Sequence, residues 1–315
     1  MFLYLVKWTT TGVAAWYRLR NRHTTGVALC NLWTLVKPCT PSNLTRELSK
    51  SLLETLKRIQ RIEEECGGEI SLSFQELPSG EIFSYFPNRK VKTASVIKFP
   101  LLAHIALAVE EGDLQWGEVI PLEEAEKTGG AGVLPYLSTG LPLTLRDLCV
   151  LMTIISDNTA TNVLIERLGV APCNAKMRAL GLRETTLYRK AYALDTPESL
   201  QFGLGSTTPQ EMLQLLTLVA ENRLGSPETC AEILHFLELQ QHRYSIPRYL
   251  PEHWTYAGKT GAIDAVRNDI GLITTTDGRR FALAVFIQKL PRVQWTVDNP
   301  GVLAIAQIAQ MLLPS

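Results

Sequence analysis

One hydroxyl and one ammonium group stand three residues apart in the segment KTASVIKFP, residues 92–100. Positions i and i+3 of a helix are neighbours on one face, so we expect Ser95 and Lys98 to lie within hydrogen-bonding reach. The following run FPLLAHIALAVEEG is apolar on almost all sides, which is typical of a helix buried inside a domain. Because burial lowers a lysine pKa, Lys98 is a candidate base that activates the Ser95 hydroxyl as a nucleophile.

Two further motifs carry groups that acyl transfer needs. Ser156-Asp157-Asn158 lies where an apolar run ends and the next helical segment begins, and Lys259-Thr260-Gly261 lies on an expected strand. The motifs S-x-x-K, S-D-N and K-T-G therefore occur in this order, each in a fitting structural context. K-T-G also occurs earlier, at 127–129, where no strand pattern surrounds it; we interpret that copy as a solvated loop.

The ordered set resembles the class A β-lactamases and penicillin-binding proteins, and the resemblance covers residues from about 42 to 315. It implies that Ser95 is the nucleophile and Lys98 its base. It also implies that Ser156 relays a proton to the leaving nitrogen and that Lys259 binds the substrate carboxylate.

The resemblance extends to substrate-binding residues. It implies that Asn158 contacts the substrate amide and that Thr260, before Gly261, helps to bind the carboxylate. The backbone N–H of Ala262 would form an oxyanion hole together with that of Ser95, at the positive end of a helix. Arg267 would add a second charge for the carboxylate, or it is simply an exposed strand arginine.

The chain departs from class A β-lactamases in the loop that carries their water-activating glutamate. Counted without gaps, that position falls on Tyr192, and the asparagine four residues later falls on Thr196. Neither side chain is a substitute base. The ion pair that ties the ends of this loop in the family would fall on Lys190 and Gly205, so we expect it to be missing.

Other carboxylates near this loop leave an alternative open. Asp195 and Glu198 lie within it and would reach the site if the loop is gapped or refolded, whereas Glu166, in the helix after S-D-N, is given no role. Without a base at the ester, an acyl-enzyme formed from a β-lactam should be long-lived. The departure favours a D-alanyl-D-alanine peptidase, resembling the cyanobacterial class A-like enzymes of the PBP-A type.

Strand patterns stand on both sides of a central helical block, so distant strands must meet in one sheet. We expect an α+β fold of the β-lactamase/transpeptidase type: a five-stranded, mostly antiparallel sheet between terminal helices and an inserted helical subdomain at about 113–240. The expected elements are a helix at 42–65, strands at 69–77 and 81–88, a buried helix from 95, strands at 254–263, 269–276 and 279–288, and a helix at 299–313.

Composition excludes several classes of partner. The 315 residues carry 31 basic and 31 acidic side chains, and the body of the chain has no patch rich in Lys and Arg with interleaved aromatics, which argues against nucleic-acid binding. The cysteines show neither C-x-x-C spacing nor histidine neighbours, so we expect no metal site and no cofactor, but buried thiols with at most one disulfide. The six are Cys30, Cys39, Cys66, Cys149, Cys173 and Cys230.

Residues 1–41 differ from the rest and form an N-terminal extension. A basic segment at 18–23 followed by an apolar run at 24–36 is the order of an export signal, although no A-x-A-like cleavage site follows. An anchor, a poor signal peptide and a misplaced start codon remain alternatives. We expect an exported or periplasmic protein, with possible membrane association through this segment.

These observations predict a penicillin-recognising serine hydrolase that forms an acyl-enzyme and cleaves D-Ala-D-Ala in cell-wall peptides. We expect a monomer whose partners are a peptidoglycan stem peptide or a β-lactam. The first alternative is a class A β-lactamase that hydrolyses these antibiotics. The second, from another class, is a non-catalytic peptidoglycan-binding module, against which an intact nucleophile beside a base argues.

Overall fold

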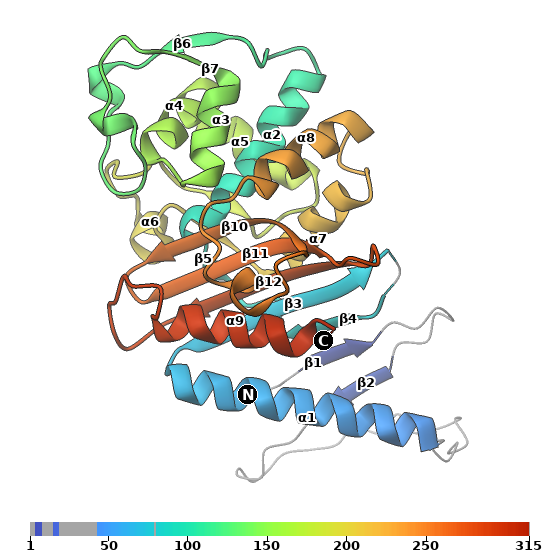
Figure 1. Cartoon of the computed structure of the whole chain (residues 1–315). Coiled ribbons are helices and arrows are strands. Elements are labelled where there is room, and N and C mark those ends of the chain that lie inside the picture. The colour runs from blue at the N-terminus through green and yellow to red at the C-terminus, as the bar shows by residue number, and fades with distance from the viewer. Residues whose placement is uncertain (1–3, 8–14, 19–42, 79, 315) are drawn as a thin grey trace, which may run out of the picture.

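The computed structural model describes residues 4–7, 15–18, 43–78 and 80–314, with side chains from residue 51 onward (Figure 1). Its helices are α1 (Asn43–Cys66), α2 (Lys98–Glu110), α3 (Leu145–Ile154), α4 (Asn158–Leu168), α5 (Val170–Ala179), α6 (Pro197–Phe202), α7 (Pro209–Ala220), α8 (Pro227–Glu238) and α9 (Pro300–Leu312). Its strands are β1 (Tyr4–Lys7), β2 (Ala15–Arg18), β3 (Glu69–Leu77), β4 (Ile82–Tyr85), β5 (Val91–Lys92), β6 (Val119–Pro121), β7 (Pro142–Thr144), β8 (Thr186–Leu187), β9 (Gly205–Thr207), β10 (Thr255–Ile263), β11 (Val266–Thr274) and β12 (Arg280–Gln288). Four short 3₁₀ helices accompany them: η1 (Ala94–Ile97), η2 (Glu124–Glu126), η3 (Leu134–Tyr136) and η4 (Ile246–Tyr249).

The main sheet has five strands in the order β10-β11-β12-β3-β4, and every neighbouring pair is antiparallel. The hairpin near the N-terminus therefore joins the three C-terminal strands through the β12–β3 pair, as the sequence predicts. Asp277-Gly278 forms the β11–β12 turn, with Gly278 at φ +84°. Two boundaries are wrong by three residues. β4 ends at Tyr85 rather than 88, and β11 begins at Val266 rather than 269, so Arg267 and Asn268 belong to the strand.

Both faces of this sheet are buried, and β12 shows why. Its side chains alternate, with Phe281, Leu283 and Val285 in one core and Ala282 and Ala284 in the other. The first core lies under α1 and α9, which cover one face of the sheet (Figure 1). The second lies between the sheet and the helical block, where α7 packs on β3 and β12. The α+β architecture with terminal helices on one face is confirmed.

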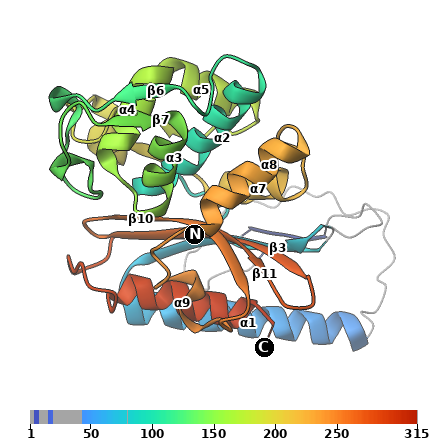
Figure 2. The same cartoon turned by 45° about the horizontal axis from the view of Figure 1, so that its top comes forward.

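The helical block stands on the other side of the sheet, with α2 running through its middle (Figure 2). α2 contacts α3, α4, α5 and α8, which explains why its sequence is apolar all round. Although α2 precedes residue 113, it lies in this block. The block therefore reaches further toward the N-terminus than the predicted range of 113–240.

The N-terminal extension is described only as β1 and β2, which pair antiparallel with each other. The basic segment after Arg18 and the apolar run at 24–36, on which the export expectation depends, lie outside the described residues. None of the described helices is both long and apolar enough to cross a bilayer. Four cysteines, Cys66, Cys149, Cys173 and Cys230, are buried free thiols, whereas Cys30 and Cys39 lie outside the described part.

Candidate active site

Ser95 is held at a turn where the sheet meets the helical block. It lies in η1, one 3₁₀ turn ahead of α2, rather than in the α-helix itself. The preceding Thr93 donates from its N–H and its hydroxyl to the Gly205 carbonyl, at 3.0 and 2.9 Å. Asn268 Nδ2 on β11 donates to the carbonyls of Lys92 and Thr93, at 2.9 and 3.0 Å. The backbone on which Ser95 stands is therefore fixed by contacts with two separate strands, β9 and β11.

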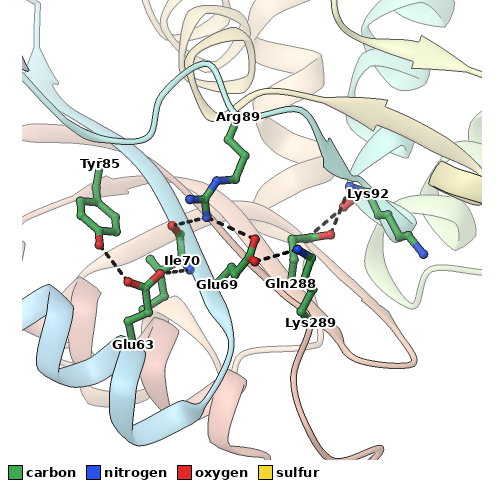
Figure 3. A network of polar contacts seen from close by, with 8 residues as sticks. All are labelled: Glu63, Glu69, Ile70, Tyr85, Arg89, Lys92, Gln288 and Lys289. Carbon is green, nitrogen blue, oxygen red and sulfur yellow. Dashed lines mark hydrogen bonds and ion pairs between the residues drawn. The ribbon is translucent and has the colours of Figure 1, made fainter. Parts of the chain in front are cut away.

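Polar contacts at the far end of the sheet secure the approach to this turn (Figure 3). Gln288, the last residue of β12, accepts a hydrogen bond from the Lys92 N–H at 3.2 Å and donates to Asn268 Oδ1 at 3.0 Å. Next to it, Glu69 lies 2.7 Å from Lys289 Nζ and 3.7 Å from Arg89 Nη1. The contacts of Gln288 attach β5, which directly precedes the Ser95 turn, to the end of β12.

Gly261 allows the K-T-G strand to approach the nucleophile. A Cβ built on Gly261 would lie 2.7 Å from the Thr93 carbonyl oxygen and 3.1 Å from the Ser95 nitrogen, closer than side chains tolerate. The glycine of K-T-G is therefore required by contact with the Ser95 turn. As a result, Ser95 and Ala262, the two expected oxyanion-hole residues, line the same cleft.

Lys98 is fully buried, and its three donors are all used. Its Nζ donates to the Ser156 carbonyl at 2.7 Å, to Ser156 Oγ at 3.1 Å and to Asn158 Oδ1 at 2.9 Å. The expected Ser95–Lys98 hydrogen bond is not formed, and the Ser95 hydroxyl has no partner among the described residues. The spacing of one turn places the two side chains on the same side of the helix, but the Lys98 ammonium donates to Ser156 and Asn158 of the S-D-N turn instead of to Ser95.

Ser156 connects the two buried lysines. Its Oγ accepts from Lys98 Nζ at 3.1 Å and from Lys259 Nζ at 3.2 Å. Ser156 stands in the α3–α4 junction at φ +61°, in the left-handed region that residues other than glycine seldom adopt. The structure thus brings Ser156, Lys98 and Lys259 together, and a hydroxyl between two ammonium groups suits a proton relay.

Asp157, the middle residue of S-D-N, was not singled out from the sequence, yet it builds the turn. It is fully buried, and its carboxylate accepts from the N–H groups of Val133 at 2.6 Å, Leu134 at 2.9 Å and Ala160 at 3.0 Å. Its position before a helical segment fits an N-cap, which was the available signal. Asp157 therefore positions Ser156 and Asn158 on either side of it.

The earlier K-T-G copy at 127–129 is a loop as predicted, but it is not simply solvated. The Thr128 N–H donates to Thr159 Oγ1 at 2.9 Å, and Asn158 Nδ2 donates to the Gly129 carbonyl at 3.1 Å. The loop thus lies against the S-D-N helix. It fixes the side-chain amide of Asn158, whose oxygen is held by Lys98.

A cleft of about 620 Å³ opens beside the nucleophile. Ser95, Asn158, Tyr192, Ala262 and Trp295 are among the residues that line it. A smaller cavity of about 100 Å³ adjoins it, lined among others by Thr260, Gly261, Ala262, Arg267 and Trp295. The predicted substrate-binding residues are therefore divided between two adjoining spaces.

Arg267 is not an exposed strand arginine. It is buried, and its guanidinium donates to the carbonyls of Ile263 at 2.8 Å, Val266 at 2.6 Å and Gln294. Trp295 stacks on the guanidinium with 4.8 Å to the ring centroid. Arg267 thus contributes positive charge to the small cavity, while most of its hydrogen bonds go to backbone.

No carboxylate lines the 620 Å³ cleft in the described part of the chain. Tyr192, at φ +58° and largely exposed, occupies the wall. A Cβ on Gly130 would lie 2.7 Å from the Tyr192 hydroxyl, so this phenol reaches the loop across the cleft. Neither Asp195 nor Glu198 is among the residues that line the cleft, so the structure gives no support to the alternative that one of them takes the place of the missing glutamate.

The loop is tied by ion pairs other than the one considered from the sequence. Lys190 pairs with Glu166, at 2.5 Å between Nζ and Oε2, on the outside of the α4 helix. Arg189 pairs with Asp195, at 3.1 Å between Nε and Oδ1. Position 205 is a glycine and forms no ion pair with Lys190, but these two other ion pairs hold the loop in its place. The Lys190 contact lowers the pKa of Glu166, so this carboxylate is ionised outside the cleft.

Burial controls the charge of the two lysines. It lowers the pKa of Lys98 well below its ordinary value, and the positive charge of Lys259 lowers it further. Burial also lowers the pKa of Lys259 to about 7, against the opposing effect of Asp269. Both effects favour the neutral, basic form of Lys98, which is the form that a general base requires.

Asp269 and His242 complete the electrostatics, and neither was identified from the sequence. Burial raises the pKa of Asp269 to about 7, although hydrogen bonds from Tyr256 at 2.5 Å and the Ile246 N–H at 3.0 Å oppose this. His242 Nδ1 lies 3.5 Å from Thr260 Oγ1, and burial followed by the two lysine charges lowers its pKa. Only the tertiary structure brings these groups beside K-T-G.

These shifts predict a bell-shaped pH dependence for acylation by a penicillin. The rate should rise as Lys98 loses its proton, and it should fall as pH rises through about 7, where Lys259 loses the charge that would bind the substrate carboxylate. We expect Lys259→Arg to move the alkaline limb upward, because a guanidinium stays protonated. Second-order labelling rates with a fluorescent penicillin, measured at pH values on both sides of about 7, would show the alkaline limb that Lys259 sets. An alkaline limb unchanged in Lys259→Arg would contradict the assignment.

The fold and the site together define a class: serine acyl-transfer enzymes in which a buried lysine stands beside the nucleophile on an α+β scaffold. The chain belongs to the Beta-lactamase enzyme family, whose model matches residues 54–314. The predicted relation to class A β-lactamases and penicillin-binding proteins is thereby confirmed.

Individual relatives include members of both groups. A β-lactamase from Sphaerobacter thermophilus is 33 % identical in a match covering 83 % of this chain and 98 % of that one, with a TM-score of 0.75. PBP-A is 26 % identical over 82 % of this chain and 94 % of its own, with a TM-score of 0.73, and a variant of it was solved as an acyl-enzyme complex with penicillin G. A β-lactamase from Rhodobacter capsulatus is 25 % identical over 78 % of this chain and 84 % of its own.

Proposed function

We propose that this serine hydrolase is a D-alanyl-D-alanine peptidase that acts on cell-wall peptides. β-Lactams acylate it, and the resulting acyl-enzyme is hydrolysed slowly. The observation that carries the proposal is the cleft beside Ser95, whose described lining holds no carboxylate and presents Tyr192 instead. Hydrolysis of an acyl-enzyme needs a base that activates water, and the described lining of this cleft supplies no carboxylate for that role. Two of the similar proteins are named as β-lactamases and one as PBP-A, so both activities are represented among them.

The steps follow from the contacts. Ser95 Oγ attacks the carbonyl carbon next to the C-terminal D-alanine while Lys98 Nζ takes its proton, and the carbonyl oxygen becomes an oxyanion at the Ser95 and Ala262 N–H groups. The C–N bond then breaks, and the proton passes from Lys98 through Ser156 Oγ to the leaving nitrogen, along the 3.1 Å contact. A peptide product departs as D-alanine and leaves room for water. A fused β-lactam leaving group stays attached to the acyl part.

Action on peptidoglycan requires export from the cytoplasm. The basic and apolar order of residues 18–36 supports this part of the proposal. Fractionation of cells that express the full chain, followed by immunodetection, tests it. Protein found only in the cytoplasmic fraction would count against a cell-wall substrate.

The central experiment follows the intact mass of the protein after one addition of benzylpenicillin. We expect a one-to-one adduct that persists, with ester loss slower by roughly 100-fold or more than in an enzyme with a positioned base. In parallel, a peptide ending in D-Ala-D-Ala should release D-alanine catalytically. Sustained hydrolysis of penicillin in large excess without D-alanine release would instead establish a β-lactamase. A protein that binds the peptide but forms no adduct and releases nothing would be a binding module.

A further inference from the structure

The 620 Å³ cleft contains a positive charge that the chemistry described above does not use. Among its described lining residues, Arg189 is the one with an ionic side chain. It belongs to the loop of Tyr192 rather than to the K-T-G strand. The other cations of the site, Lys98, Lys259 and Arg267, are buried and do not line this cleft.

Arg189 is only partly neutralised. Its Nε lies 3.1 Å from Asp195 Oδ1, and its Nη1 donates to the Lys190 carbonyl at 3.0 Å. The remaining amine, Nη2, has no hydrogen-bond partner in the described part of the chain. Asp195 is itself shared with Ser199, whose hydroxyl lies 2.9 Å away, and its side chain is 47 % exposed. The half-exposed Asp195 carboxylate offsets part of the charge of Arg189, and the guanidinium keeps Nη2 as a donor without a partner among the described residues.

The position of Arg189 determines which part of a substrate it meets. Thr260 and Arg267, which are predicted to bind the terminal carboxylate of the substrate, line the adjoining small cavity. The larger cleft holds Ser95 and Asn158, and so it receives the acyl part that becomes attached to Ser95. Arg189 and Asn158 line this same acyl-part cleft.

We propose that Arg189 is a specificity-determining residue that selects substrates with a carboxylate on the acyl part and disfavours those with an ammonium group there. Charge-assisted hydrogen bonds from a guanidinium to a carboxylate are strong and directional, whereas an ammonium at the same place would be repelled. The inference rests on the proposed function, because it assumes that Ser95 takes up the acyl group. It adds the chemical class of the side chain recognised in that cleft.

Three penicillins that differ by one substituent test this directly. Benzylpenicillin has a neutral methylene next to its phenyl ring, carbenicillin has a carboxylate on that carbon, and ampicillin has an ammonium. We expect the second-order acylation rate, measured by competition with a fluorescent penicillin, to be higher for carbenicillin than for ampicillin. Arg189→Gln should lower this carbenicillin-to-ampicillin ratio about tenfold, the effect of one partly screened charge contact.

Two variants separate recognition from loop stability. Asp195→Asn breaks the same ion pair but releases the guanidinium, so it should raise the carbenicillin-to-ampicillin ratio. If Arg189 served only to stabilise the loop, Asp195→Asn should instead change the ratio as Arg189→Gln does. Lys190→Gln removes the adjacent positive charge, which pairs with Glu166 outside the cleft, and should leave the ratio unchanged. An equal change for all three penicillins in both Arg189→Gln and Asp195→Asn would overturn the inference alone. Failure of the wild type to react with any penicillin would overturn the proposed function, and the inference with it.

Discussion

Ser95→Ala is expected to abolish covalent labelling by every penicillin, because the alanine has no oxygen that attacks the carbonyl. The protein should otherwise remain intact, since the Ser95 hydroxyl makes no hydrogen bond within the described residues and the side chain is only half-buried. The backbone that holds it depends on Thr93, Gly205 and Asn268 instead. We therefore expect complete loss of the mass adduct with an unfolding midpoint close to that of the wild type.

Ser156→Ala is the matched control for this substitution. It removes a hydroxyl from the same site, but one placed for proton relay between Lys98 and Lys259 rather than for attack. It should slow labelling without abolishing it, and prolonged incubation should still produce the one-to-one adduct. Persistent labelling of Ser95→Ala, with the modified peptide mapped elsewhere, would show that another residue is the nucleophile.

Lys98→Met is expected to slow acylation by a factor of roughly 100 to 10,000, the usual contribution of general base catalysis. Methionine fills a similar volume without a charge, so it limits the cavity that alanine would leave in the buried position. It does leave the Ser156 carbonyl and Asn158 Oδ1 without the donor that now reaches them at 2.7 and 2.9 Å. Some loss of stability is therefore expected, and thermal unfolding must be measured beside the rate.

The pH profile distinguishes a base from a merely structural lysine. If Lys98 accepts the proton from Ser95, the acidic limb of the acylation profile should disappear in Lys98→Met. If it only orders the S-D-N turn, the rate should fall by one factor at all pH values and the limb should remain. Lys98→Arg offers a second comparison, because it keeps the positive charge but does not act as a base near neutral pH. Normal acylation by Lys98→Arg would contradict the assignment.

Much of the active site was predictable because its chemistry depends on a few residue types at short spacing. Ser95 and Lys98 are joined by one helical turn, and the apolar sequence after them indicates burial of the lysine. The K-T-G strand follows from its own β pattern, and the strong Asp277-Gly278 turn marks the hairpin of the next two strands. These are local properties, in which helix period, strand alternation and turn chemistry act within about ten residues.

The hydrogen bonds of Lys98 were not predictable in this way. The short spacing to Ser95 suggests a direct bond, but the ammonium is satisfied by Ser156 and Asn158, which are 58 and 60 residues further along the chain. Which partner a buried lysine takes depends on the position of the α3–α4 turn. That turn is set in part by the Asp157 carboxylate and the N–H groups of Val133 and Leu134.

The sequence by itself determined the α+β architecture and which segments form the sheet, including the K-T-G strand. It also predicted Ser95 as the nucleophile and Lys98 as its base. Only the tertiary structure decided that Tyr192 and Arg189 line the cleft, that Asp195 is withdrawn into an ion pair, and that Arg267 donates to backbone carbonyls. The physical reason is the range of the interactions. Periodicity and turns act along the chain, whereas the lining of a cleft and the charge of a buried group depend on segments that meet only when the sheet and the helical block pack together.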